Sequence, residues 1–283
     1  MDPSCLQYRL TDEERVHFDE QGYLIVRGVL PGNLVEELSL AVDALDEQFR
    51  PQRNLSATQP LNLLDFIGKD DRFLELIDWP KTFPKVWDIL GWHIQLYHSH
   101  VLVTPPLPAG HTPSQSRLHW HQDSGRLNLD LEGDPRPRVS LKVGYFLTST
   151  METDRGNFHV VPGSHLRNEL DLPSDEALDH PRALAVRADA GDAVLFDRRI
   201  WHSGGRNTSD VTRKVLFYGY SYRWLRPRDD MTVAHYIDRS DPIRRQLLGV
   251  SPNGGFGYTS PAEEDVPLKS WLTEHLGAQA LRP

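Results

Sequence analysis

One short segment of the chain, Leu118-His119-Trp120-His121-Gln122-Asp123, carries the residues best suited to bind a metal ion. If this segment is a strand, His119, His121 and Asp123 point to one side, because successive side chains alternate between the two faces. An imidazole and a carboxylate two residues apart on one face can chelate a single ion. The residue types and their spacing therefore predict a metal site with nitrogen and oxygen ligands.

A third ligand has to come from another part of the chain, and His202 is the best candidate. Two histidines and one carboxylate leave coordination positions open, which suits non-haem Fe(II) and the activation of oxygen. His119 is an alternative to His121 as the ligand, and its other role would be a hydrogen bond in the pocket. His165 is a weaker candidate, because it follows Pro162-Gly163-Ser164, which is typical of a tight turn.

One arginine has a spacing from His202 that suits the binding of a carboxylate. Arg213 follows His202 by eleven residues, after a turn that contains glycine, asparagine and serine, on a strand predicted over 212–222. A guanidinium forms paired, charge-assisted hydrogen bonds with a carboxylate. A dicarboxylate cosubstrate could therefore chelate the metal with one end and bind Arg213 with the other. The alternative is a solvated charge at the edge of a strand.

Two further cations are candidates for binding the substrate. Lys142 lies in the strand predicted over 139–147, where alternation places the apolar residues Leu141, Val143, Tyr145 and Leu147 on the opposite face. A buried ammonium needs a partner, so an anion beside Lys142 is one interpretation and a solvent-facing lysine is the other. Arg126, three residues after Asp123, could bind an anionic group at the mouth of the site or remain solvated.

The elements that must position these groups differ between the two ends of the chain and its centre. The N-terminal part, residues 1–90, is predicted to be mainly helical with one short strand. Thr11 and Glu14 form a capping-box pattern at its start. The predicted elements are a helix from Thr11 to Gly22, a strand over 23–26, a second helix from Pro31, a loop over 50–60 and a helical region over 61–90. The second helix is predicted from apolar residues that recur at helical spacing, namely Val35, Leu38, Val42, Leu45 and Phe49.

After Gly91, short β-type segments alternate with turns rich in glycine and proline, which is typical of a sandwich or barrel. Residues 91–225 are therefore predicted to form a β core, and residues 226–283 a helical tail. No linker separates these parts, so we expect a single domain over 1–283. Strands are expected over 94–104, 117–123, 139–147, 157–161, 192–196 and 215–222, and tail helices over 243–248 and 267–276.

The composition restricts the class of function. Forty acidic and 31 basic residues give a formal net charge of −9, which offers no electrostatic reason to expect nucleic-acid binding. No apolar stretch approaches the roughly 18 residues of a membrane span, and the start of the chain lacks the pattern of a signal peptide. Cys5 is the single cysteine and cannot form an internal disulfide, so we expect a cytoplasmic protein with Cys5 near a mobile terminus.

The order of these motifs resembles the phytanoyl-CoA dioxygenase family, a branch of the Fe(II)/2-oxoglutarate-dependent oxygenases. The resemblance spans roughly residues 11–225 and implies a mainly β fold, with a double-stranded β-helix (jelly-roll, cupin-like) core and flanking helices. It is carried by Gln21-Gly22-Tyr23-Leu24-Ile25-Val26, Trp120-His121-Gln122-Asp123, Val161-Pro162-Gly163-Ser164-His165, Ala190-Gly191-Asp192 before His202, and Arg213.

Residue by residue, the resemblance implies that His121, Asp123 and His202 are the iron ligands and the catalytic centre. It implies that Arg213 binds the distal carboxylate of 2-oxoglutarate. Halogenating relatives replace the carboxylate ligand with a small residue, so the intact Asp123 favours hydroxylation or a related oxidation.

Three further positions follow from the same resemblance. His100 falls near a position that lines the cosubstrate pocket, where other members carry an apolar residue. Gly204 stands where a serine often helps to hold the cosubstrate, and Gly144 where a tryptophan often lies against it. These departures affect the finer contacts of the cosubstrate and not the metal site.

The activity implied is that of an oxygenase that uses Fe(II), 2-oxoglutarate and O2 to oxidise an unactivated C–H bond of a small organic substrate, with release of succinate and CO2. Loops around 105–116, 124–138 and 225–260 are expected to line the substrate entrance. One alternative is a cupin-like metal hydrolase or isomerase, which would not need Arg213. Another is a non-catalytic jelly-roll binding protein, which the intact ligands disfavour. The substrate, a possible coenzyme A group and the oligomeric state lie beyond the sequence.

Overall fold

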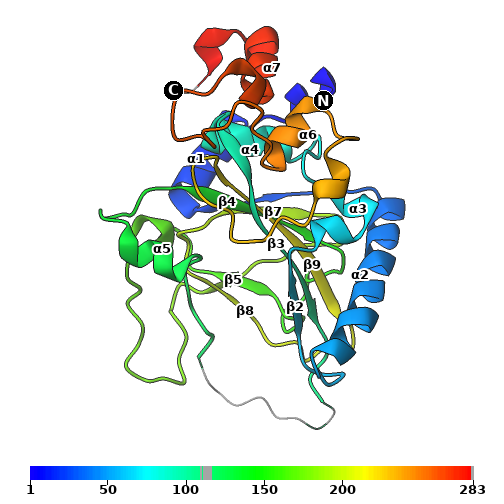
Figure 1. The fold of residues 1–283 in the computed structure, drawn as a ribbon. Coiled ribbons are helices and arrows are strands. Elements are labelled where there is room, and N and C mark those ends of the chain that lie inside the picture. Colours follow the sequence, from blue (N-terminus) through cyan, green and yellow to red (C-terminus); the bar gives the residue numbers. More distant parts are fainter. Residues whose placement is uncertain (109, 111–116, 282–283) are drawn as a thin grey trace.

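Two antiparallel β-sheets form the centre of the computed structural model, which describes residues 1–108, 110 and 117–281. Within these residues the larger sheet has the strand order β1-β7-β4-β9-β3-β2 and the smaller sheet the order β6-β5-β8. Helices cover the larger sheet on one side, and the smaller sheet lies on its other side (Figure 1). This is the predicted jelly-roll core with flanking helices.

The elements have the following bounds. The strands are β1 (Tyr23–Val26), β2 (Leu61–Leu64), β3 (Ile94–Thr104), β4 (Ser140–Phe146), β5 (Phe158–Val160), β6 (Leu184–Ala185), β7 (Ala193–Asp197), β8 (His202–Gly204) and β9 (Arg213–Tyr222). The helices are α1 (Asp12–Gln21), α2 (Gly32–Gln52), α3 (Asp71–Leu74), α4 (Phe83–Leu90), α5 (Gly125–Asp130), α6 (Pro242–Leu247) and α7 (Pro267–Leu276).

The predicted capping box at the start of α1 is confirmed. The Thr11 hydroxyl accepts a hydrogen bond from the Glu14 backbone N–H, and the Glu14 carboxylate accepts one from the Thr11 N–H. The helix ends at Gly22, whose φ of 80° is in the left-handed region that favours glycine. A Cβ on Gly22 would lie 2.5 Å from the His165 ring, so this turn and His165 pack together.

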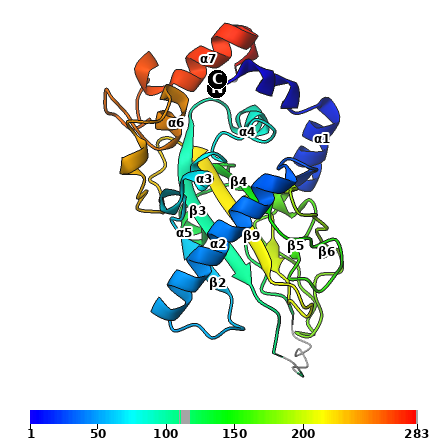
Figure 2. The same cartoon turned by 90° about the vertical axis from the view of Figure 1, so that its right-hand side faces the viewer.

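Helix α2 crosses the outer face of the larger sheet, in front of β3 and β9 (Figure 2). Val35, Leu38, Val42 and Leu45 recur at the spacing of one helical face, and all four are buried. The helix continues to Gln52, beyond the predicted loop start at residue 50, with Pro51 in its last turn. The predicted apolar spacing therefore identifies the face that α2 buries.

Strand alternation divides β4 between two environments, as predicted. Leu141, Val143 and Tyr145 face the helices and belong to the main hydrophobic core. Phe146 belongs to a second apolar cluster, which lies between the two sheets. Lys142 shares the inward face with Phe146, so the strand carries this cation to the interior of the jelly roll.

Three predictions about local structure are wrong. Leu61–Leu64, predicted as the start of a helical region, is strand β2, in which Leu61 and Leu63 are buried and the chain pairs with β3. Residues 117–123 do not form a strand, because a turn at Leu118 to Trp120 leaves only His121 in a β-bridge. Cys5 is buried rather than near a mobile terminus, and burial raises the pKa of its thiol to about 11.

The tail contains the predicted helices α6 and α7. Asp241 caps α6, because its carboxylate accepts hydrogen bonds from the N–H groups of Ile243 and Arg244. Within the described residues, none of the helices is long and apolar enough to span a membrane.

Replacing Leu38 with alanine tests the packing of α2. Leu38 is fully buried, so Leu38→Ala is expected to lower the free energy of unfolding by about 2–5 kcal/mol, because it leaves a cavity. Leu40 lies two residues away on the same helix and is 66% exposed, and Leu40→Ala should change stability by no more than about 0.5 kcal/mol. Urea unfolding followed by circular dichroism measures both. Equal losses would contradict the packing described.

Candidate functional site

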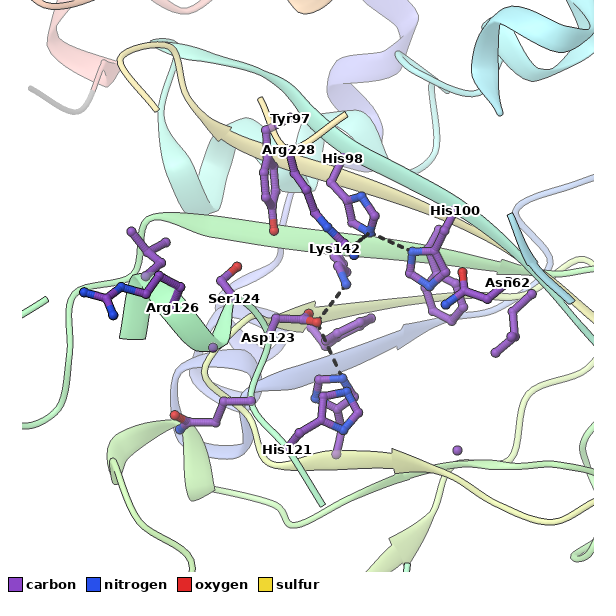
Figure 3. Close-up of a pocket in the computed structure, with 18 of the residues that line it drawn as sticks. Asn62, Tyr97, His98, His100, His121, Asp123, Ser124, Arg126, Lys142 and Arg228 are labelled. Atoms are coloured by element: carbon purple, nitrogen blue, oxygen red, sulfur yellow. Dashed lines mark hydrogen bonds and ion pairs between the residues drawn. The ribbon is translucent and has the colours of Figure 1, made fainter. Parts of the chain in front are cut away.

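A cavity of about 700 Å³ lies between the two sheets. Eight of the residues singled out as site candidates line it, and Figure 3 shows several of them converging. These residues are His100, His121, Asp123, Arg126, Lys142, His202, Gly204 and Arg213. Residues of the predicted entrance loops also line the cavity, namely Ser124 to Leu127, Leu225, Arg226 and Arg228. Of the loop around 105–116, residues 109 and 111–116 lie outside the described residues.

The backbone brings the two candidate histidines side by side. The His121 N–H donates to the His202 carbonyl at 3.0 Å, and the His202 N–H donates to the His121 carbonyl at 2.9 Å. The imidazole centroids are 4.3 Å apart. The Asp123 N–H donates to the Arg198 carbonyl at 2.9 Å, which fixes the carboxylate next to the two rings.

The hydrogen bonds of each imidazole leave one particular nitrogen free. Nδ1 of His202 lies 2.9 Å from the Ile200 carbonyl, and Nδ1 of His121 lies 3.1 Å from the His119 carbonyl. A carbonyl only accepts, so Nδ1 carries the proton in both rings and Nε2 keeps its lone pair. This is the arrangement that orients histidines as metal ligands.

Asp123 completes a cluster in which one ligand atom from each of the three residues lies within 4.8 Å of the others. Its Oδ1 is 3.9 Å from His202 Nε2 and accepts a hydrogen bond from Lys142 Nζ at 2.8 Å. Its Oδ2 is buried and has no hydrogen-bond partner in the described part of the chain. Two imidazole lone pairs and an unpartnered carboxylate oxygen fit a divalent cation such as Fe(II).

Burial and charge act in opposite directions on these groups. Burial alone would raise the pKa of Asp123, but the Lys142 ammonium and the two histidines outweigh it and hold that pKa well below its usual range. Burial lowers the pKa of His202 to about 4, against the opposing effect of Asp123. At neutral pH, Asp123 is therefore ionised and His202 neutral, the protonation states in which both bind metal.

Arg213 is buried at the β9 end of the cavity. Its Nε has no hydrogen-bond partner among the described residues, and none of the ion pairs formed by these residues includes Arg213. The guanidinium lies over the Phe146 ring at 5.6 Å. Burial lowers the pKa of Arg213 to about 10, so the group keeps its charge at neutral pH. A buried cation without a counterion fits a ligand that carries a carboxylate.

Comparison with known sequences identifies the family. The chain matches the phytanoyl-CoA dioxygenase (PhyH) family over residues 18–215. It belongs to the phytanoyl-CoA dioxygenase family. An uncharacterized protein of Mycobacterium tuberculosis is 28% identical over 241 residues, which cover 81% of this chain and 82% of that protein. Dioxygenase af480 of Aspergillus fumigatus is 37% identical over 109 residues, which cover 38% of this chain and 35% of the relative.

Solved structures support the fold. HygX from Streptomyces hygroscopicus, solved with iron bound, is similar with a TM-score of 0.60 and 19% identity, covering 77% of this chain and 89% of that one. The non-heme alpha ketoglutarate dependent carbocyclase SnoK from nogalamycin biosynthesis gives a TM-score of 0.58 and 23% identity, covering 82% and 92%. The jelly-roll core predicted from the family resemblance is thus confirmed.

The departures from the family pattern have a structural explanation. A Cβ on Gly144 would lie 2.8 Å from the Phe217 ring, so Phe217 of the neighbouring strand occupies the space that a larger side chain at position 144 would need. The Phe217 ring also stacks on His100, with centroids 4.5 Å apart. At Gly204 a Cβ would meet no described atom within 4 Å, so the family's serine would fit there.

Other candidates have different surroundings. His119 is exposed and lies outside the three-residue cluster. Arg126 is exposed on α5, within the predicted loop 124–138, and pairs with Asp130 one turn later. His165 is buried, and its Nε2 hydrogen-bonds to the Asp19 carbonyl, which agrees with a structural role. Gln122 donates to two backbone carbonyls and holds the segment in place.

Sequence reasoning missed a polar network beside the cavity. Nδ1 of His98 lies 2.8 Å from the Asp229 carboxylate. Nε2 of His98 contacts both His100 Nδ1 at 2.9 Å and Arg228 Nη1 at 3.1 Å, and Figure 3 shows these three side chains side by side. An arginine only donates, so His98 Nε2 accepts and His98 is neutral. Burial also lowers the pKa of His98. The sequence feature that could have indicated this network is the His-x-His spacing of His98 and His100, which places both side chains on one face of a strand.

Replacing Asp229 with asparagine tests this network. The Asp229 carboxylate accepts from His98, from the Ser99 N–H at 2.6 Å and from the Ser99 hydroxyl. An amide would place a donor against one of these donors, so Asp229→Asn should lower the free energy of unfolding by about 1–3 kcal/mol. Asp230→Asn at the exposed neighbouring position is the control and should have little effect. Urea unfolding midpoints that match for the two variants would rule out the network's contribution.

Proposed function

We propose that this protein is a Fe(II)/2-oxoglutarate-dependent dioxygenase that hydroxylates, or otherwise oxidises, an unactivated C–H bond of a small organic substrate. In this proposal residues 1–283 form one domain. The observation that carries the proposal is a pair of complementary sites in one cavity. One is a cluster of two imidazole lone pairs with a carboxylate, and the other is a buried guanidinium that forms no ion pair with any of the described residues.

Each residue has a separate task in this proposal. When bound, Fe(II) and 2-oxoglutarate supply an oxidation in which substrate, O2 and 2-oxoglutarate give hydroxylated substrate, succinate and CO2. His121, Asp123 and His202 hold the ion from one side and leave the cavity side open. Arg213 binds the distal carboxylate of the cosubstrate and thereby orients it. Phe158, Phe196 and Phe217 line the cavity and limit the access of water.

Removing any one proposed ligand should weaken metal binding. His121→Ala, Asp123→Ala and His202→Ala are each expected to weaken Fe(II) binding about tenfold or more, because a facial site loses one of three ligands. His119→Ala is the matched control, since His119 is exposed and lies outside the cluster. Anaerobic Fe(II) titration measures the affinity. If His119→Ala loses binding and His121→Ala keeps it, the ligand assignment is wrong.

Arg213 separates the proposed dioxygenase from a cupin-like hydrolase, which needs no dicarboxylate. Arg213→Met should weaken 2-oxoglutarate binding roughly ten- to hundredfold, because a charge-assisted hydrogen bond is worth about 1.5–3 kcal/mol. The readout is the weak visible charge-transfer band formed when 2-oxoglutarate is added anaerobically to the Fe(II) protein. Arg167→Met, at an exposed arginine, is the control. Unchanged 2-oxoglutarate affinity in Arg213→Met would favour the hydrolase.

A further inference from the structure

The cavity carries more positive charge than the proposed reaction uses. The chain as a whole is acidic, with 40 acidic and 31 basic residues. Among the described residues that line the cavity, five are lysine or arginine and one, Asp123, is a carboxylate. The iron and 2-oxoglutarate account for Asp123 and Arg213. Of the remaining cations, Arg126 pairs with Asp130, which leaves Lys142, Arg226 and Arg228.

Strand register separates Lys142 from Arg213. Along β9, Arg213 pairs with Thr104, whereas Gly219 pairs with Lys142 on one side and with His98 on the other. Six residues of strand separate Arg213 from Gly219, which is about 20 Å at roughly 3.3 Å per residue. A cosubstrate carboxylate held by Arg213 therefore does not reach the position beside Lys142 and His98.

Lys142 has hydrogen-bonding capacity to spare. Its side chain is buried, and its hydrogen bond in the described structure goes to Asp123 Oδ1 at 2.8 Å. An ammonium has three N–H donors, so two remain for another acceptor. Because a buried cation is costly without an anion, an anionic group next to Lys142 would be favoured once the Asp123 charge is shared with a metal ion.

Arg228 is held beside the same position. Its Nη1 donates to His98 Nε2, while the backbone N–H groups of Arg228 and Asp229 both donate to the Tyr97 carbonyl. This carbonyl lies at the bulge of β3 between Leu96 and His98. The Asp229 carboxylate accepts hydrogen bonds from His98 and from the Ser99 N–H. It therefore holds His98 in place, and it forms no ion pair with Arg228 in the described structure.

We propose that the substrate is a small organic anion whose carboxylate or phosphonate group binds between Lys142 and Arg228. The inference rests on the proposed function and names its substrate class. The apolar part of the substrate packs against Leu127, Leu225 and Phe196, which line the same cavity. Because Lys142 directly contacts Asp123, the carbon that is oxidised lies within a few bonds of the anionic group.

Matched probes test the charge requirement. Octanoate, octylphosphonate and neutral octanamide are titrated calorimetrically and anaerobically into the Fe(II) protein saturated with 2-oxoglutarate, which occupies Arg213. At least one anion should bind about tenfold or more tightly than octanamide, as expected for charge-assisted hydrogen bonds. The preferred anion distinguishes a carboxylate from a phosphonate substrate. Equal binding of the amide, or binding of neither anion, would overturn the proposal.

Variants locate the anion. Arg228→Gln and Lys142→Met should each weaken binding of the preferred anion about tenfold or more, while the affinity for 2-oxoglutarate stays within about twofold. Lys81→Met is the matched control, since Lys81 is partly exposed and donates to the Gly28 carbonyl away from the cavity. If Lys142→Met instead weakens 2-oxoglutarate binding and leaves the anion unaffected, Lys142 is a cosubstrate contact and the proposal is wrong.

The two proposals fail in different measurements. The charge-transfer band formed by Fe(II) and 2-oxoglutarate tests the proposed dioxygenase. The calorimetric preference for the anion over the amide tests the substrate class. A protein that forms the band but binds octanamide as well as octanoate would keep the proposed function and lose the further inference.

Discussion

The candidate site depends on two backbone hydrogen bonds, those that join His121 and His202. The two residues are far apart in the chain, and His121 belongs to no strand. The bridge places both rings side by side, and each ring donates Nδ1–H to a carbonyl two residues before it. Short, local stretches of backbone therefore set the position and the tautomer of both rings. The lone pairs proposed to bind the metal are thus oriented by the protein alone.

The charged groups around this bridge differ in how strongly they destabilise the free protein. Asp123 and Lys142 neutralise each other at 2.8 Å, so both are tolerated in the interior. Arg213 has no such partner in the described structure, and burial disfavours its charged form. The free protein thus carries an unfavourable charge at one end of its cavity, which a bound carboxylate would relieve. Under the proposed function, this is where the distal carboxylate of the cosubstrate would be recognised.

Sequence patterns predicted the structural features that depend on local residue spacing. They did not predict the features that depend on contacts between residues far apart in the chain. The capping box at Thr11 and the apolar stripe of α2 are local, and both are confirmed. Strands β6 and β8 are too short to show a pattern, and β2 is a strand because it pairs with β3. The role of His98 depends on Asp229, which lies 131 residues later in the tail. No spacing within β3 could have indicated that contact.

Gly144 shows why residue-by-residue transfer from a family has limits. The position lacks the family's aromatic side chain, yet the cavity wall there is aromatic, because Phe217 on the adjacent strand covers the glycine. Strand pairing makes the two positions neighbours, so the wall can be built from either side while the volume stays filled. The same wall carries Lys142 two residues before Gly144, where strand alternation gives it the same inward face. A single position in one strand does not define the shape or the charge of the cavity. A comparison of this cavity wall between relatives therefore has to include the residues of both paired strands.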